Sequence, residues 1–128
     1  MKIKLNSVFV DGQDKALKFY TGVPGFKKKN DIPVGPFRWL TVVSPEEPNG
    51  TELVLEPDTN PAAKAYQKSV FEQGIPVTAF QVDDIDNEYG RLQKLGVAFK
   101  KPPTSMGLVT LTMFDDNCGN FIQIYQVL

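Results

Sequence analysis

The chain repeats one pattern, and this repeat constrains the fold more than any other feature of the sequence. Residues 5–26 have the pattern of a strand ending at Asp11, a short amphipathic helix, and a glycine break that leads into a second strand. Residues 77–99 show the same order, with Asp83 in the place of Asp11. Self-similarity of this kind indicates that one supersecondary unit is built twice.

The remaining segments extend each copy to the order β-α-β-β-β. Strands are predicted from β-branched and aromatic runs bounded by turn residues, and helices from apolar residues three or four positions apart. Three lysines make the second strand typical of a sheet edge, and Asp11 and Asp14 are expected to cap the first helix. Without βαβαβ alternation, the chain is predicted to be α+β. The predicted strands are residues 2–10, 26–32, 37–43, 51–56, 77–83, 97–101, 108–114 and 121–127, and the helices lie within 11–22, 58–74 and 84–95.

Charge balance and the absence of histidine exclude several classes of function. A formal net charge of −1 supplies no field that gathers phosphates, so we expect no nucleic-acid partner. Without histidine, the chain cannot form a Ser-His-Asp or Cys-His nucleophile, a two-histidine iron site or a histidine-built zinc site. Acid–base chemistry would therefore fall to carboxylates, lysine, tyrosine or Cys118.

The sequence also predicts where the protein resides. The N-terminal residues lack the apolar core and the cleavage site of a signal peptide, and no apolar run approaches the ~20 residues of a membrane span. One cysteine cannot form an internal disulfide, which fits a reducing compartment. We therefore expect a cytoplasmic protein with no membrane partner.

The order of several short motifs resembles the vicinal oxygen chelate superfamily, which includes glyoxalase I, bleomycin-binding proteins and extradiol dioxygenases. The first half carries VD-x-x-x-KA-x-x-FY-x-x-x-x-GF from Val10 to Phe26, and the second carries Val82-Asp83 and the turn DNCGN at residues 116–120. The resemblance covers essentially the whole chain. It implies that each βαβββ module curls into half of a cup, so that the two form a single cup-shaped domain. Module 1 would then span about residues 1–57, a helical connector 58–75, and module 2 about 76–128.

The resemblance further implies four metal-ligand positions, at which the family has histidine or glutamate. Here these positions fall on Leu5, Glu56, Val77 and Gln123. Only Glu56 is a good ligand, because Leu5 and Val77 have no donor atom and Gln123 offers a neutral carbonyl. One carboxylate, one amide and water would hold a hard divalent cation weakly. We therefore expect no cofactor, beyond a weakly held divalent metal at most.

The same positions, together with strand alternation, predict a ligand-binding site. The site would be apolar and aromatic with a few polar points, as small-molecule sites usually are. Glu56 could act there as a catalytic base or as a hydrogen-bonding anchor, and the plain alternative is a solvated acid at the end of a strand. The predicted ligand-binding residues are Leu5, Ser7, Trp39, Glu56, Val77, Gln123 and Tyr125.

The leading prediction for function is a protein that binds a small organic molecule in an apolar cup, without a metal. One alternative is an enzyme of the glyoxalase, lyase or dioxygenase type that uses Glu56 as base or as a residual metal ligand. A second alternative is a structural or interaction subunit, in which the ligand positions are free to change. The resemblance also implies a homodimer.

Overall fold

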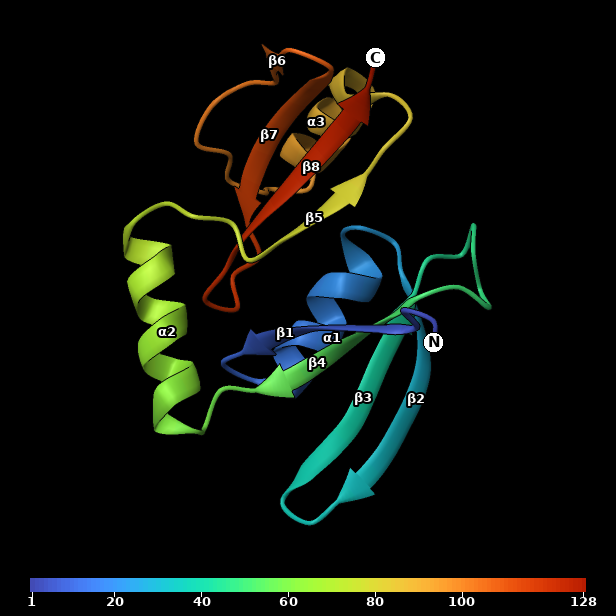
Figure 1. Cartoon of the computed structure of the whole chain (residues 1–128), viewed down its shortest axis with the longest axis vertical. Helices are drawn as coiled ribbons and strands as arrows, with labels where there is room; N and C mark the ends of the chain where they lie inside the picture. The colour runs from blue at the N-terminus through green and yellow to red at the C-terminus, as the bar shows by residue number, and fades with distance from the viewer. The chain divides into compact units, whose positions relative to one another are not determined.

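The computed structural model describes all of residues 1–128, and the chain divides into two compact units, Met1–Gln67 and Lys68–Leu128. Each unit has one four-stranded sheet and a helix of its own, and the helix α2 spans the boundary (Figure 1). No helix has the length and apolar character that crossing a membrane requires. The elements are β1 (Leu5–Val10), α1 (Gln13–Gly22), β2 (Lys27–Val34), β3 (Phe37–Val43), β4 (Glu52–Pro57), α2 (Pro61–Glu72), β5 (Thr78–Gln81), α3 (Ile85–Lys94), β6 (Thr104–Met106), β7 (Val109–Asp115) and β8 (Phe121–Val127).

The two sheets have the same strand order, which is β1-β4-β3-β2 in the N-terminal unit and β5-β8-β7-β6 in the C-terminal unit. In each sheet the first strand pairs parallel with the last, and the other neighbours pair antiparallel. The predicted α+β class and the two βαβββ modules are therefore confirmed. The lysine-rich β2 is an edge strand, as predicted, so its lysines lie where they discourage pairing with another chain.

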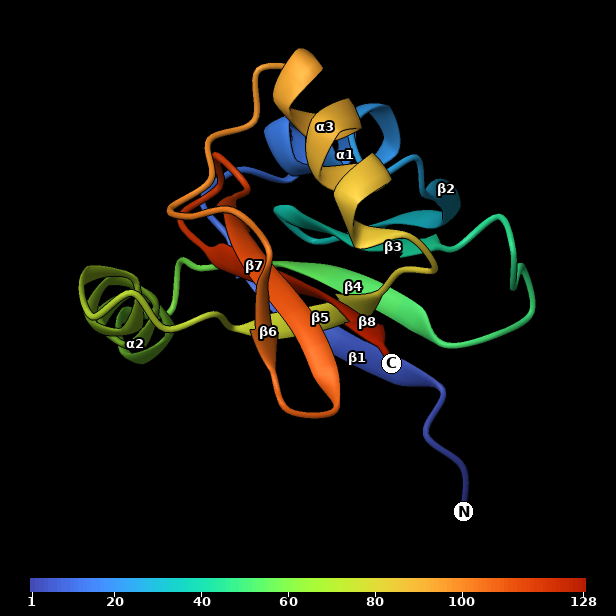
Figure 2. The same cartoon turned by 90° about the horizontal axis from the view of Figure 1, so that it is seen from above.

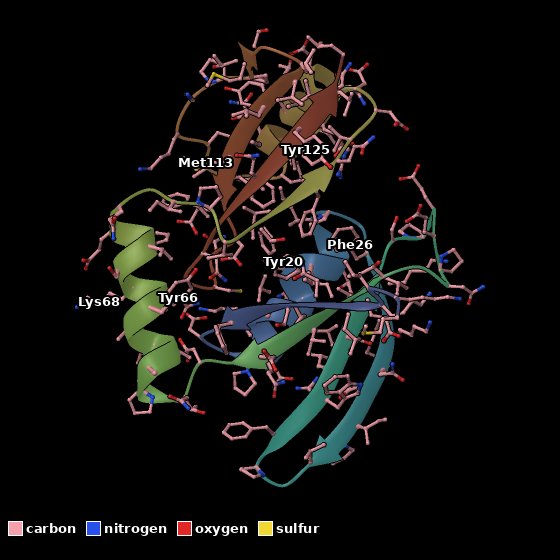
Figure 3. The ribbon with its side chains drawn as sticks, viewed as in Figure 1. Tyr20, Phe26, Tyr66, Lys68, Met113 and Tyr125 are labelled. Atoms are coloured by element: carbon pink, nitrogen blue, oxygen red, sulfur yellow. The ribbon has the colours of Figure 1, made fainter.

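The core of the N-terminal unit lies between α1 and one face of the sheet (Figure 2). Strand alternation brings every second side chain to this face. Tyr20 is fully buried; its ring meets Phe19 edge-on at 5.2 Å between centroids and stacks on Phe26 at 6.5 Å (Figure 3). The other buried residues of this layer are Val8, Val10, Ala16, Leu40, Val42, Leu53 and Leu55.

The C-terminal unit repeats this arrangement with α3 against its sheet. Ile85 and Leu92 are the buried residues of α3, and Ile122 and Ile124 are the buried aliphatic residues of β8 that alternate toward the same layer. An aromatic chain extends the core, because the ring of Phe99 lies 4.7 Å from that of Tyr89 and 5.8 Å from that of Phe114. Each unit thus buries one face of its sheet under its own helix.

The helix that follows the first strand begins differently in the two modules. In α3, Asp84 is the N-cap and its side chain accepts a hydrogen bond of 3.1 Å from the backbone N–H of Asn87. In α1, the N-cap is Gly12 and no side chain caps the helix. The predicted side-chain capping is therefore wrong, because Asp11 pairs with Lys15 and Asp14 pairs with Arg38 instead. Asp14 does lie in the first turn, where its negative charge suits the helix dipole, as expected.

The strand predicted at residues 97–101 is also wrong. Only an isolated bridge between Phe99 and Phe114 forms there, and the strand β6 lies at Thr104–Met106, inside a segment that was predicted to be a loop. The reason is Pro102-Pro103, because two consecutive prolines have no N–H groups for a ladder and pairing resumes only after them.

Candidate functional site

Each sheet has a second face, opposite its own helix, and the predicted site residues of the N-terminal unit lie on this face. We call it the N-terminal open face. Large apolar side chains remain exposed here: Leu5 is 49% exposed, Ile32 is 52% exposed and Trp39 is 36% exposed. Exposed large apolar side chains that gather on one face are typical of a binding site. Pairing and alternation assign to this face Leu5, Ser7, Phe9, Lys27, Asn30, Ile32, Val34, Phe37, Trp39, Thr41, Val43, Glu52, Val54 and Glu56. Thr41, Val43 and Val54 are the buried members of this set.

The register of β1 and β4 determines which of these residues are neighbours. Leu5 pairs with Glu52, whereas Glu56 pairs with Phe9. Glu56 therefore lies four residues along the strand from the pairing partner of Leu5, a distance of about 13 Å. The structure brings Leu5 and Glu56 to the same face without making them neighbours. Glu56 is half-buried and pairs in register with Phe9.

A second carboxylate on this face, Glu52, was not among the predicted site residues. Its Oε1 accepts hydrogen bonds from the hydroxyl of Thr41 at 2.8 Å and from the side-chain amide of Asn30 at 2.9 Å. Its Oε2 lies 3.8 Å from the ammonium group of Lys29. Strand alternation predicts Glu52 on the same face as Glu56, and the structure agrees. Its partners could not be foreseen, because a bulge between Lys28 and Asn30 sets the register of β2.

The strands β3 and β4 pair over only two positions, Thr41 with Val54 and Val42 with Leu53. Beyond them, the side chain of Gln13 from α1 bridges the two backbones. Its Nε2 donates to the carbonyl of Arg38 at 2.7 Å and to that of Leu55 at 3.0 Å, and its Oε1 accepts from the N–H of Arg38 at 3.1 Å. The carboxamide thus replaces the hydrogen bonds that a continued ladder would make.

Trp39 and Glu56 each lie two residues beyond the last of these pairs, Trp39 on β3 and Glu56 on β4. They stand on either side of the place where Gln13 separates the strands. The ring of Trp39 and the carboxylate of Glu56 therefore border the same interruption of the β3–β4 ladder.

Charges on the helix side of this sheet neutralise one another. Arg38 donates to Asp31, with 2.9 Å between Nε and Oδ1, and also pairs with Asp14. The hydrogen bond from Arg38 holds the pKa of Asp31 below its usual value, and the two carboxylates raise the pKa of Arg38. The basic charge of Arg38 is therefore committed to structural pairs and is not free to hold an anionic ligand.

The face of the C-terminal sheet opposite α3 carries the other three predicted site residues. Gln123 and Tyr125 lie on β8, and Met113 on the neighbouring β7 pairs with Gln123 (Figure 3). The hydroxyl of Tyr125 donates to Oε1 of Gln81 at 3.5 Å. Val77 directly precedes β5, and its N–H donates to the carbonyl of Phe121 at 3.0 Å. This unit therefore brings Val77, Gln123 and Tyr125 to one face.

The residues at the family's ligand positions do not fit a divalent cation. In the N-terminal unit, Leu5 has no atom that could bind a metal, and Glu56 pairs four positions farther along the strand. The carboxylate of Glu52 is already bonded to neighbouring side chains. In the C-terminal unit, Val77 has no donor and Gln123 offers an amide. Within neither unit do three His, Cys, Asp or Glu residues gather as a metal-binding group. We therefore derive no chemistry through a metal.

Comparison with known protein families agrees with this fold. The model of the Glyoxalase/Bleomycin resistance protein/Dioxygenase superfamily matches residues 2–124. The chain therefore belongs to this superfamily, as its motifs indicated.

Individual relatives span almost the full chain. YurT of Bacillus subtilis (strain 168), an uncharacterized protein, is 57% identical over 98% of this chain and 99% of its own length. The crystal structure of UcmS2 has a TM-score of 0.84 and 29% identity, covering 98% of this chain and 97% of that chain. TnmS3, an antibiotic-binding protein from Streptomyces sp. CB03234, has a TM-score of 0.76 and 29% identity, covering 100% of this chain and 97% of that chain.

Proposed function

We propose that this protein binds a small organic molecule on the open faces of its sheets, without a metal. The observation that carries the proposal is the exposed apolar and aromatic surface of the N-terminal open face, where Trp39, Ile32 and Leu5 have no covering element in their own unit. Surfaces of this composition with a few polar groups are typical of small-molecule sites. Glu56 supplies such a group in the N-terminal unit, and Gln123 and Tyr125 supply such groups in the C-terminal unit.

The relatives support this class of ligand. TnmS3 is described as an antibiotic-binding protein, and its identity of 29% extends over this whole chain. By this likeness, we propose that the ligand is an antibiotic-like organic compound. The exposed ring of Trp39 favours a flat, largely apolar one, such as a polycyclic antibiotic. The enzyme alternative has weaker support, because Glu52 is bonded to Asn30 and Thr41 and Glu56 has no positioned acid–base partner.

Trp39 is the only tryptophan of the chain, so its fluorescence tests the proposal directly. We expect a polycyclic antibiotic such as daunorubicin to quench the emission of Trp39 and to raise the melting temperature, because a ligand that binds only the folded state stabilises it. Replacing Trp39 by leucine removes the ring on which the ligand stacks. This change should weaken binding roughly tenfold when measured by equilibrium dialysis.

A matched control is Leu95→Ala, which removes a 52% exposed apolar side chain at the end of α3. This variant should bind as the parent protein does. If a broad panel of flat compounds neither quenches Trp39 nor raises the melting temperature, the proposed function is wrong. Equal affinity of the Trp39→Leu and parent proteins would instead remove the N-terminal open face from the site.

We also propose that the protein is a homodimer in the cytoplasm, as the family resemblance implies. Light scattering coupled to size-exclusion chromatography measures the mass directly. A mass of one chain at working concentrations would contradict the dimer without affecting the binding proposal.

A further inference from the structure

The N-terminal open face carries one carboxylate that the fold does not use. The side chain of Glu56 is half-buried, and no hydrogen bond or ion pair engages it. The other carboxylate of this face, Glu52, is bonded to Asn30 and Thr41 and lies near Lys29. Glu56 is therefore the negative charge on this face that still lacks a counter-ion.

The strands on both sides of β4 carry an aromatic residue on this face. Phe9 pairs with it across β1 and β4, and Trp39 lies on β3 at the corresponding position beyond the last β3–β4 pair. Ile32 pairs with Trp39 and extends the apolar surface onto β2. The face of an aromatic ring attracts a cation, as a carboxylate does, so the ring faces and the charge favour the same kind of ligand.

This arrangement discriminates among ligand charges. An anionic ligand would meet an uncompensated carboxylate, and the nearby Arg38 is already paired with Asp31 and Asp14. A neutral apolar ligand would cover Glu56 and remove water from it without supplying a partner, which is costly for a charged group. A ligand with a protonated amine avoids both costs.

Building on the proposed function, we propose that the N-terminal open face selects flat aromatic compounds that carry a protonated amine. Glu56 is the counter-ion of the amine, and Trp39 and Phe9 contact the aromatic body. The charge of Glu56 thus sets the specificity of the site, and the apolar side chains of Phe9, Trp39 and Ile32 supply general affinity.

Three acridines of nearly the same shape test the inference by equilibrium dialysis at neutral pH. They are 9-aminoacridine, which is a cation, acridine, which is neutral, and acridine-9-carboxylate, which is an anion. We expect the parent protein to bind the cation about tenfold more tightly than the neutral compound, with a preference that salt reduces, and to bind the anion weakest.

Glu56→Gln keeps the shape of the side chain and removes its charge. This variant should lose about tenfold in affinity for 9-aminoacridine. It should bind acridine at least as tightly as the parent protein does, because no charged group is desolvated. Glu56→Lys should reverse the preference toward the carboxylate. Glu46→Gln removes an exposed carboxylate from the loop between β3 and β4 and should change none of the three affinities.

The outcomes separate the two proposals. Equal binding of all three acridines, unchanged in Glu56→Gln, would overturn the selection of cations and leave small-molecule binding in place. A preference for the cation that persists in Glu56→Gln would assign the selection to another group and overturn the role of Glu56. No binding of any acridine up to about 1 mM would count against the proposed function and, with it, this inference.

Discussion

We expect the replacement of Asp116 by alanine to lower the free energy of unfolding by about 3–5 kcal/mol. Asp116 is fully buried in the turn between β7 and β8. Its Oδ1 accepts from the N–H of Cys118 at 2.7 Å and from that of Asn120 at 3.0 Å, and its Oδ2 accepts from the side-chain amide of Asn120 at 2.9 Å. Alanine leaves these buried donors without acceptors, and each such donor costs roughly 1–3 kcal/mol. Urea unfolding followed by circular dichroism measures the loss.

The neighbouring Asp115 provides a matched control. Its Oδ1 accepts from the N–H of Asn117 at 2.8 Å in an exposed part of the same turn, where water can replace it. Asp115→Ala should therefore cost less than about 1 kcal/mol. Asp116→Asn should fall between the two alanine variants, because its amide group meets the amide of Asn120. A similar loss for Asp115→Ala and Asp116→Ala would show that the buried carboxylate does not organise the turn.

Much of the fold could be predicted because its signals are local. The segments Phe37–Val43 and Phe121–Val127 were predicted with their observed bounds, since β-branched and aromatic residues fill them and turn residues flank them. The duplication predicted the order β-α-β-β-β in each half, and the two sheets have the same strand order. The prediction failed around residues 97–106, where Pro102-Pro103 displaced the pairing of one short strand. The apolar residues before the two prolines have the pattern of a strand, but they form only the isolated bridge between Phe99 and Phe114.

The candidate site could be predicted only in part. Alternation placed Leu5 with Ser7 on one strand and Glu52 with Glu56 on another, and the family resemblance joined the two strands. The structure brings these residues to one face. Sequence spacing could not show that Glu52, rather than Glu56, pairs with Leu5, because register depends on strands that are distant in the chain. That these residues contact a ligand stays a prediction.

Gln13 illustrates the same limit more strongly. A glutamine in the first turn of an amphipathic helix has the pattern of a solvent-facing residue, and nothing in its neighbourhood predicts three hydrogen bonds to two strands. Its role depends on the interruption between β3 and β4, which only the three-dimensional structure reveals.

We expect Gln13→Ala to lower the free energy of unfolding by about 2–4 kcal/mol, because three part-buried hydrogen bonds are lost and the backbone groups of Arg38 and Leu55 lose a partner. Gln73→Ala is the control, since the side chain of Gln73 bonds only the exposed hydroxyl of Ser69, and it should cost less than about 0.5 kcal/mol. Urea unfolding measures both variants.

Gln13→Glu separates hydrogen bonding from packing, because it keeps the shape of the side chain and exchanges its donor for an acceptor. At neutral pH, a carboxylate oxygen would face the carbonyls of Arg38 and Leu55, so this variant should be at least as unstable as Gln13→Ala. Protonation would restore one donor, and the stability of Gln13→Glu relative to the parent protein should therefore improve as the pH falls toward 4. If Gln13→Glu were as stable as the parent protein at neutral pH, the carboxamide could not be what joins β3 to β4. Something other than Gln13 would then have to keep β3 and β4 apart between Trp39 and Glu56.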